Sequence, residues 1–194
     1  MAYSPGKNAL KKKQTKPSLL KGIHSRWLQI WPVLLFGLGF ASLMILFYVV
    51  WLSDYFQNSI HPHIISVNAR LSSFILNLFG MGTSTMNAMI SSSSFSVDIA
   101  RGCDGVEAMA LYASALLSFR GTWRYKLAGF FGGIAILFTL NIVRIISLFL
   151  TGIYFPKFFE IMHVEVWQVL FIIFAIGLFG LWIWWSGKGE SHAA

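Results

Sequence analysis

Three residues with reactive or charged side chains stand out because long apolar segments adjoin each of them. Cys103 is the single cysteine among 194 residues and lies in the stretch ARGCDGVEAMA. Arg144 lies in FTLNIVRIISLF, and His163 lies in EIMHVEVW. A thiol can attack a carbonyl, an imidazole can move the protons and a guanidinium can stabilise an oxyanion. Acyl transfer by this trio requires that the elements carrying the three residues bring them to one place.

The composition indicates an integral membrane protein. Hydrophobic residues make up 56% of the chain and charged residues only 11%, and a membrane-spanning helix needs about 20 consecutive apolar residues. We therefore predict an all-α integral membrane fold with four transmembrane helices, at residues 30–52, 102–119, 127–150 and 164–185. The first segment is about twice as long as the apolar region of a signal peptide, and no small-residue cleavage site follows it, so we expect an uncleaved anchor.

The basic residues predict the orientation of the chain across the membrane. Residues 1–26 carry seven of the fifteen Lys and Arg residues and no acidic residue, which predicts a cytoplasmic N-terminal tail. Four spans then place the basic segment 120–126 and the tail 187–194 in the cytoplasm as well, around a single membrane-embedded domain at residues 27–186. The net charge of +8 thus reflects topology and contact with lipid headgroups. No base-stacking or groove-reading motif accompanies it, so we predict no nucleic-acid partner.

The residues between the first two predicted spans are too polar to cross a membrane. Over residues 54–79 apolar side chains recur every three or four positions, which predicts an amphipathic helix lying on the outer membrane surface. Gly80 and Gly82 should end it. Residues 85–100 then alternate apolar and polar side chains around a serine-rich turn, which predicts a small β-hairpin that leads into Cys103. The apolar positions of the predicted helix are Phe56, Ile60, Ile64, Val67, Leu71, Ile75 and Leu78.

Helix geometry places the three reactive residues at similar depths. With a rise of about 1.5 Å per residue, Cys103 lies about 24 Å, Arg144 about 26 Å and His163 about 33 Å from the inner ends of their predicted spans. All three should therefore reach the outer third of the membrane.

Arg144 is expensive inside a spanning segment unless it is paired or faces a wet cavity. The alternative is an arginine that extends to the outer interface. Asn141 lies one turn earlier on the same face, and we expect it to line the same cavity and to steady the guanidinium.

Cys103 lies at a predicted helix start, where the helix dipole favours a thiolate. The alternative is a small buried apolar residue with no chemical role. Asp104 and Glu107 have the spacing of a capping pair, although a carboxylate at position 104 would oppose thiolate formation.

His163 is suited to act as the acid and base because an imidazole titrates near neutral pH. An interfacial histidine can instead contact lipid headgroups. His61 and His63, in the sequence HPH, are also predicted outside and compete for this role. The spacing of the three histidines is not typical of a zinc site, so we predict no metal and no cofactor.

Three short stretches, RGCDGVEA, LNIVRIISL and MHVEVWQ, follow in this order on successive predicted spans. Together they resemble the exosortase/archaeosortase family and most closely the bacterial type called exosortase H, over residues 97–167. The resemblance implies a cysteine transpeptidase of the bacterial inner membrane that cleaves the C-terminal sorting tail of secreted proteins, with its active site on the periplasmic side. By the same resemblance Cys103 is the nucleophile, Arg144 stabilises the oxyanion and His163 is the acid and base, supported by Gly105 of the Cys-x-Gly motif and by Asn141. Many members have serine where this chain has Asp104.

Two other functions fit the same residues. In a non-catalytic membrane scaffold, Arg144 would pair with Asp104 or Glu107 to hold the helices together. In a membrane thiol acyltransferase or hydrolase, the same three residues would act on lipid rather than on peptide. The oligomeric state, the recognition motif and the acceptor amine do not follow from the sequence.

Overall fold

The computed structural model describes residues 19–99 and 102–191 of the chain. This part is mostly helical and contains one small antiparallel sheet, so the predicted fold class is confirmed at this level. The chain divides into two units, residues 1–35 and 36–194, and every residue of the candidate site belongs to the second. Most of the predicted N-terminal tail, the end of the predicted C-terminal tail and Ala100 of the predicted hairpin lie outside the described residues.

Three helical stretches in the described residues are long and apolar enough to cross a membrane. The first belongs to α1 (Leu19–Trp51) and the second is α4 (Trp123–Tyr154). The third runs through η2 (Pro156–Phe158), α5 (Phe159–Ile161), η3 (Met162–Val166) and α6 (Trp167–Ser191). The matching candidate spans are Ile30–Trp51, Trp123–Tyr154 and Pro156–Lys188. Most side chains of these spans are apolar, as expected of helices that meet lipid.

The remaining predicted span corresponds to α3 (Val106–Ser118), whose 13 residues extend about 20 Å. Its predicted start at residue 102 is wrong. Gly102 and Gly105 have φ angles of 85° and 76°, and a right-handed helix cannot include such residues. Cys103 and Asp104 therefore lie in a non-helical segment ahead of α3. The prediction that this region makes a fourth crossing stays a prediction.

The predicted amphipathic helix is present as η1 (Phe56–Ile60) and α2 (His61–Leu78). Its buried face includes four polar side chains, whereas the predicted apolar face, with Val67, Leu71 and Leu78, is exposed. The helix thus turns polar groups toward the protein and apolar groups outward, which suits contact with lipid. The buried polar residues of α2 are His61, Asn68, Ser72 and Ser73.

The predicted hairpin is part of a sheet of three strands, β1 (Ser84–Met86), β2 (Met89–Ser91) and β3 (Ser96–Asp98), in the order β1-β2-β3. β2 and β3 pair antiparallel with Ile90 opposite Val97. β1 was not predicted; it pairs antiparallel with β2.

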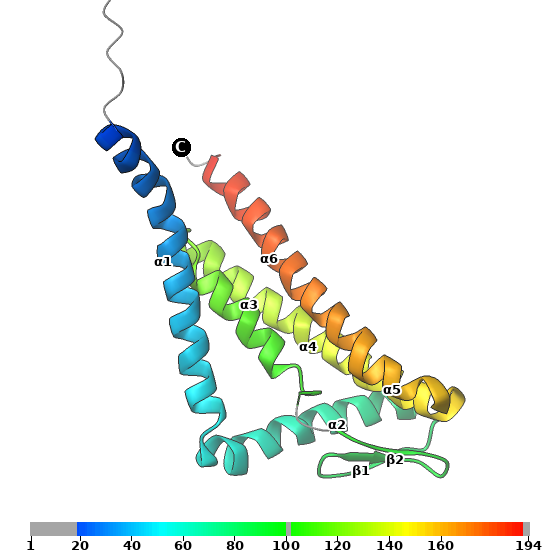
Figure 1. Ribbon diagram of the computed structural model, residues 1–194. Helices are drawn as coiled ribbons and strands as arrows, with labels where there is room; N and C mark the ends of the chain where they lie inside the picture. Colours follow the sequence, from blue (N-terminus) through cyan, green and yellow to red (C-terminus); the bar gives the residue numbers. More distant parts are fainter. Residues whose placement is uncertain (1–18, 100–101, 192–194) are drawn as a thin grey trace, which may run out of the picture. The chain divides into compact units, whose positions relative to one another are not determined.

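Helices α3, α4 and α6 pack against one another, and α2 and the sheet lie at the end of this bundle where α3 begins (Figure 1). The side chains of Ile145 and Phe149 on α4 are buried beneath the sheet together with Ile90 and Ile99. Full burial of such side chains stabilises a fold by about 1.5–3 kcal/mol each. This cluster fixes the segment that connects β3 to α3 and so positions Cys103.

Candidate active site

Cys103, Arg144 and His163 come together in the structure from three different elements. The Cys103 Sγ lies 2.8 Å from His163 Nε2, and Arg144 Nη2 donates a hydrogen bond of 3.5 Å to the same sulfur. Cys103 is 8% exposed and Arg144 6% exposed. A small cavity of about 20 Å³ reaches the thiol between Val97 and His163. The arrangement places a thiol, an imidazole and a guanidinium in contact, and the thiol and the imidazole line the small cavity.

His163 is held by the helix geometry around it. It lies in the π-helical turn η3, between α5 and α6, and π turns inside helices are frequent at functional sites. Its ring stacks on Phe159 at 5.7 Å between centroids and an interplanar angle of 11°. The stacking restricts rotation of the imidazole, so Nε2 stays directed at the thiol.

Arg144 is fixed by the connecting segment and by an aromatic ring. Its Nη1 donates to the carbonyl of Gly102 at 3.4 Å, and its Cζ lies 5.6 Å from the ring centroid of Phe171, within the range of a cation–π contact. The Nε group is buried and has no hydrogen-bond partner among the described residues. No acidic side chain in the described part of the chain forms an ion pair with Arg144. The guanidinium therefore keeps its positive charge available next to the sulfur.

Asn141 and Gly105 form a packing contact. Asn141 is fully buried, and a Cβ added at Gly105 would lie 3.0 Å from Asn141 Cγ. The Asn141 amide has no hydrogen-bond partner in the described residues, so the expected contact with the Arg144 guanidinium is not formed. The close approach and the positive φ of 76° together require glycine at position 105.

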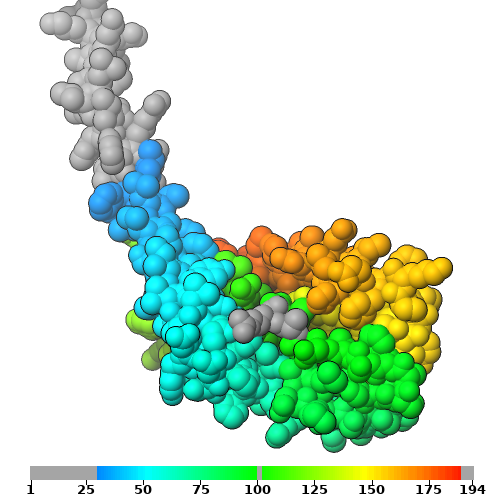
Figure 2. Space-filling model, turned by 60° about the horizontal axis from the view of Figure 1, so that its bottom comes forward, coloured from blue at the N-terminus to red at the C-terminus, as the bar shows by residue number. Residues whose placement is uncertain are grey.

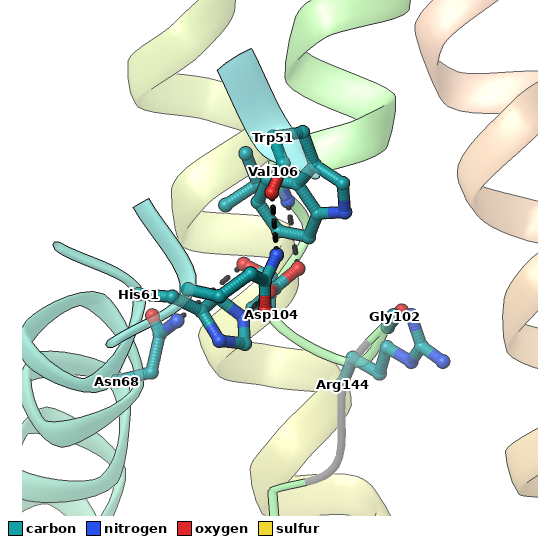
Figure 3. Close-up of polar contacts among 8 residues, drawn as sticks. Trp51, His61, Asn68, Gly102, Asp104, Val106 and Arg144 are labelled. Carbon is teal, nitrogen blue, oxygen red and sulfur yellow. Dashed lines mark hydrogen bonds and ion pairs between the residues drawn. The ribbon is translucent and has the colours of Figure 1, made fainter. Parts of the chain in front are cut away.

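The Asp104 carboxylate is directed toward His61 at the start of α2 (Figure 3). Its Oδ2 lies 2.6 Å from His61 Nε2, and its Oδ1 accepts the Val106 N–H at 3.1 Å, which satisfies a free donor at the start of α3. Asn68 donates to the Asp104 carbonyl at 3.4 Å. Asp104 is 1% exposed and His61 3% exposed. A buried network thus anchors the residue next to Cys103.

The pKa of the Cys103 thiol, which lies ahead of α3 and outside the three spanning segments, is raised above its ordinary value. Burial is the main cause, the Arg144 guanidinium lowers the pKa, and the Asp104 carboxylate raises it. The sequence-based concern about Asp104 is therefore justified in direction. A thiol with a raised pKa is mostly protonated at neutral pH, which makes the nearby His163 Nε2 the natural acceptor of its proton.

The other predicted candidates lie elsewhere. His61 binds Asp104, and His63 is exposed. Within residues 19–99 and 102–191 no three His, Cys, Asp or Glu side chains are grouped as metal ligands. A separate cavity of about 310 Å³ is lined by apolar and aromatic residues of α1, α3 and α6, and neither Cys103 nor His163 lines it.

Two contacts near the site were not predicted from the sequence: the hydrogen bond between His61 and Asp104, and the hydrogen bond from Asn68 to the Asp104 carbonyl. A signal was present, because positions 61, 65, 68 and 72 fall on one face of the helix, opposite the apolar face. Polar residues at three of these positions indicate that this face packs against other polar groups of the protein.

A polytopic membrane protein with a thiol, an imidazole and a guanidinium in contact defines a class of candidate membrane cysteine enzymes. The sequence model of the transmembrane exosortases (the EpsH exosortase family) matches residues 22–183, so the chain belongs to the transmembrane exosortase family. No curated protein and no solved structure matches the chain. The family predicted from the three short stretches is confirmed.

Proposed function

We propose that this chain is a membrane cysteine transpeptidase that cleaves the C-terminal sorting tail of secreted proteins through a thioacyl intermediate. Membership of the exosortase family supports the reaction class. The observation that carries the proposal is the contact of the Cys103 sulfur with both His163 Nε2 and Arg144 Nη2.

In the first step the Cys103 sulfur attacks the carbonyl carbon of the scissile peptide bond. His163 Nε2 accepts the thiol proton as the S–C bond forms, because the raised pKa of the thiol leaves little thiolate at rest. This role requires the tautomer that protonates Nδ1 and leaves the Nε2 lone pair free. The carbonyl oxygen then carries a negative charge.

Arg144 is the group available to stabilise that oxyanion. Its guanidinium lies beside the sulfur, and its Nε makes no bond within the described residues. In acyl-transfer enzymes one good oxyanion donor contributes about 3 kcal/mol. Within residues 19–99 and 102–191 no acidic side chain forms an ion pair with this cation.

Collapse of the tetrahedral intermediate completes the acyl transfer. The C–N bond breaks, His163 returns its proton to the departing amine, and a thioester remains on Cys103. An incoming amine, or water, attacks this thioester, and His163 accepts the proton of the attacking group. The C–S bond then breaks, the acyl product leaves, and His163 returns the proton to the sulfur, which regenerates the thiol.

The proposed orientation places this site on the periplasmic side of the bacterial inner membrane, with both termini in the cytoplasm. The basic N-terminal residues and the basic segment 120–126 support it by the positive-inside rule. About 32 Å of helix α4 separates Arg144 from Trp123, which is close to the thickness of the hydrocarbon core.

The contacts of Arg144 favour this function over a scaffold. The scaffold hypothesis expects Arg144 to pair with Asp104 or Glu107, whereas the guanidinium bonds to Gly102 and Cys103. Asp104 bonds to His61 and Val106 instead.

The proposal is tested by co-expression with a secreted reporter that ends in a short motif, a transmembrane helix and a basic cluster. Wild type should remove the tail, and Cys103→Ala should not. His163→Ala should lower the rate by about 100-fold or more, since general acid–base catalysis contributes at least this much. His63→Ala is the matched control, because His63 is exposed and belongs to no contact of the site. Unchanged tail removal by Cys103→Ala would exclude a cysteine mechanism.

A further inference from the structure

Strand β3 forms an edge of the sheet, and its outer side has unused main-chain groups. The bonds from Ser92 N to Phe95 O and from Ile99 N to Ala88 O show that residues 95, 97 and 99 turn their main-chain groups toward β2 and its flanking turns. Because successive residues of a strand alternate, Ser96 and Asp98 direct their N–H and C=O groups to the other side. Among the described residues these four groups have no hydrogen-bond partner.

A cavity runs along this free edge. It has a volume of about 360 Å³ and is lined by residues 95–98 on one side and by Gly152, Pro156, Phe159 and His163 on the other. No residue of β2 lines it, so it lies on the side of β3 away from the sheet. Figure 2 shows the strand region in green beside the yellow segment that follows α4 on one face of the protein.

The cavity leads to the nucleophile. The small cavity at Cys103 shares Val97, Asp98 and His163 with the larger one. A chain lying along β3 therefore ends beside the thiol and the imidazole. The side chains of Ser96 and Asp98 are exposed, so they do not block an approach to the edge.

An extended peptide matches these features. Its N–H and C=O groups alternate in direction with the same two-residue period as those of Ser96 and Asp98, so it can form the missing ladder. A helix satisfies its own main-chain groups and leaves none for the strand.

We propose that the free edge of β3 binds the segment of the substrate around the scissile bond as an added strand. The added strand holds that segment extended and places a carbonyl at Cys103. This inference rests on the proposed transpeptidase function and assigns the place and conformation of its peptide substrate.

A proline substitution tests the edge. Ser96→Pro removes an N–H that points away from β2, so the β2–β3 ladder stays intact, and proline is tolerated at sheet edges. The matched control is Thr85→Pro: Ile90 bonds toward β3, so Thr85, opposite it in β1, directs its N–H to the far edge of the sheet. With a reporter whose tail removal requires Cys103, Ser96→Pro should lower the rate about tenfold and Thr85→Pro by less than about twofold. Equal rates for the two variants would overturn the proposal.

Disulfide trapping tests the conformation independently of the rate. Cys103→Ala removes the single cysteine of the chain, so Asp98→Cys in that background carries one thiol. The same reporter receives single cysteines at successive positions around the cleavage site, and the complex is oxidised in membranes. An added strand brings cross-strand neighbours within reach and should give crosslinks at every second position. Crosslinks at every third or fourth position, or none, would contradict it.

The two proposals fail in different ways. If the chain is not a cysteine transpeptidase, wild type and Cys103→Ala process the reporter equally. If the strand-addition proposal alone is wrong, processing still depends on Cys103, while Ser96→Pro matches Thr85→Pro and the crosslinks lack a two-residue period.

Discussion

Replacing Asp104 by alanine should destabilise the protein by about 3 kcal/mol. The carboxylate makes a hydrogen bond of 2.6 Å to His61, and a bond to or from a charged group contributes about 1.5–3 kcal/mol. It also accepts the Val106 N–H at 3.1 Å, a bond of the type that costs about 1 kcal/mol when lost from a helix start. Because Asp104 is 1% exposed, water cannot replace either partner.

Asp104→Asn is the conservative variant. Its amide oxygen can still accept the Val106 N–H, and its NH₂ group can donate to His61 Nε2, so the shape and both contacts are kept. The loss should be about 1 kcal/mol, the difference between a charge-assisted and a neutral bond. The free energy of unfolding is measured by denaturant titration of the purified protein in detergent micelles.

A double-mutant cycle with His61→Ala isolates the pair. Asp104 and His61 are in direct contact, so the two single substitutions should not be additive, and the coupling should be about 1.5–3 kcal/mol. Two results would refute the reasoning: additive losses, or a cost below about 1 kcal/mol for Asp104→Ala. Either would mean that α2 does not hold the Cys103 segment through this contact.

Three further predictions concern the neighbours of the thiol. Gly105→Ala should destabilise by about 3 kcal/mol in the same titration, since it combines a positive φ with overpacking against Asn141; a neutral effect would contradict the backbone assignment. Alkylation of Cys103 by maleimide should rise at a higher pH than for a free thiol, because its pKa is raised, and Asp104→Asn should move the midpoint to lower pH by removing one of the causes; an unmoved midpoint would show that the carboxylate does not act on the sulfur. Arg144→Lys should lower reporter turnover by about 10²–10³-fold, since an ammonium cannot contact Gly102 and the sulfur as a fork does; turnover near that of wild type would exclude the oxyanion role.

The meeting of Cys103, Arg144 and His163 could be anticipated from sequence because regular helices convert residue counts into depth. The helix was predicted to start at residue 102, and α3 starts four residues later, at Val106. Cys103 precedes Val106, the first residue of α3, by three residues, so it lies close to the start of the helix in either case.

The start of α3 could not be predicted because glycine permits positive and negative φ almost equally. Gly102 and Gly105 adopt positive values, and only the packing of Asn141 against Gly105 shows why. The three-residue strand β1 was missed because so short a segment carries no periodic signal.

The orientation of α2 shows a limit of hydrophobic patterns in membrane proteins. The pattern located the helix correctly, but in a soluble protein its apolar face would be the buried one. Here Val67 and Leu71 are exposed, and His61 and Asn68 are buried. The role of His61 followed from this reversal, and the sequence alone treated it as a rival base.

The π turn that contains His163 allows the direction of the imidazole and the packing face of α6 to be set separately, whereas an uninterrupted α-helix would couple them. Each residue of an α-helix advances about 100° around the axis, so the angle of His163 would dictate which faces of α6 meet α3 and α4. The wider turn η3, at Met162–Val166, contains one extra residue per turn. This extra residue changes the angle between His163 and the faces of α6. The packing face of α6 therefore does not by itself fix the direction of the His163 imidazole. Deleting Val164 would restore the α-helical number of residues per turn. Either the packing of α6 against α3 and α4 or the contact of His163 with the Cys103 sulfur would then be lost.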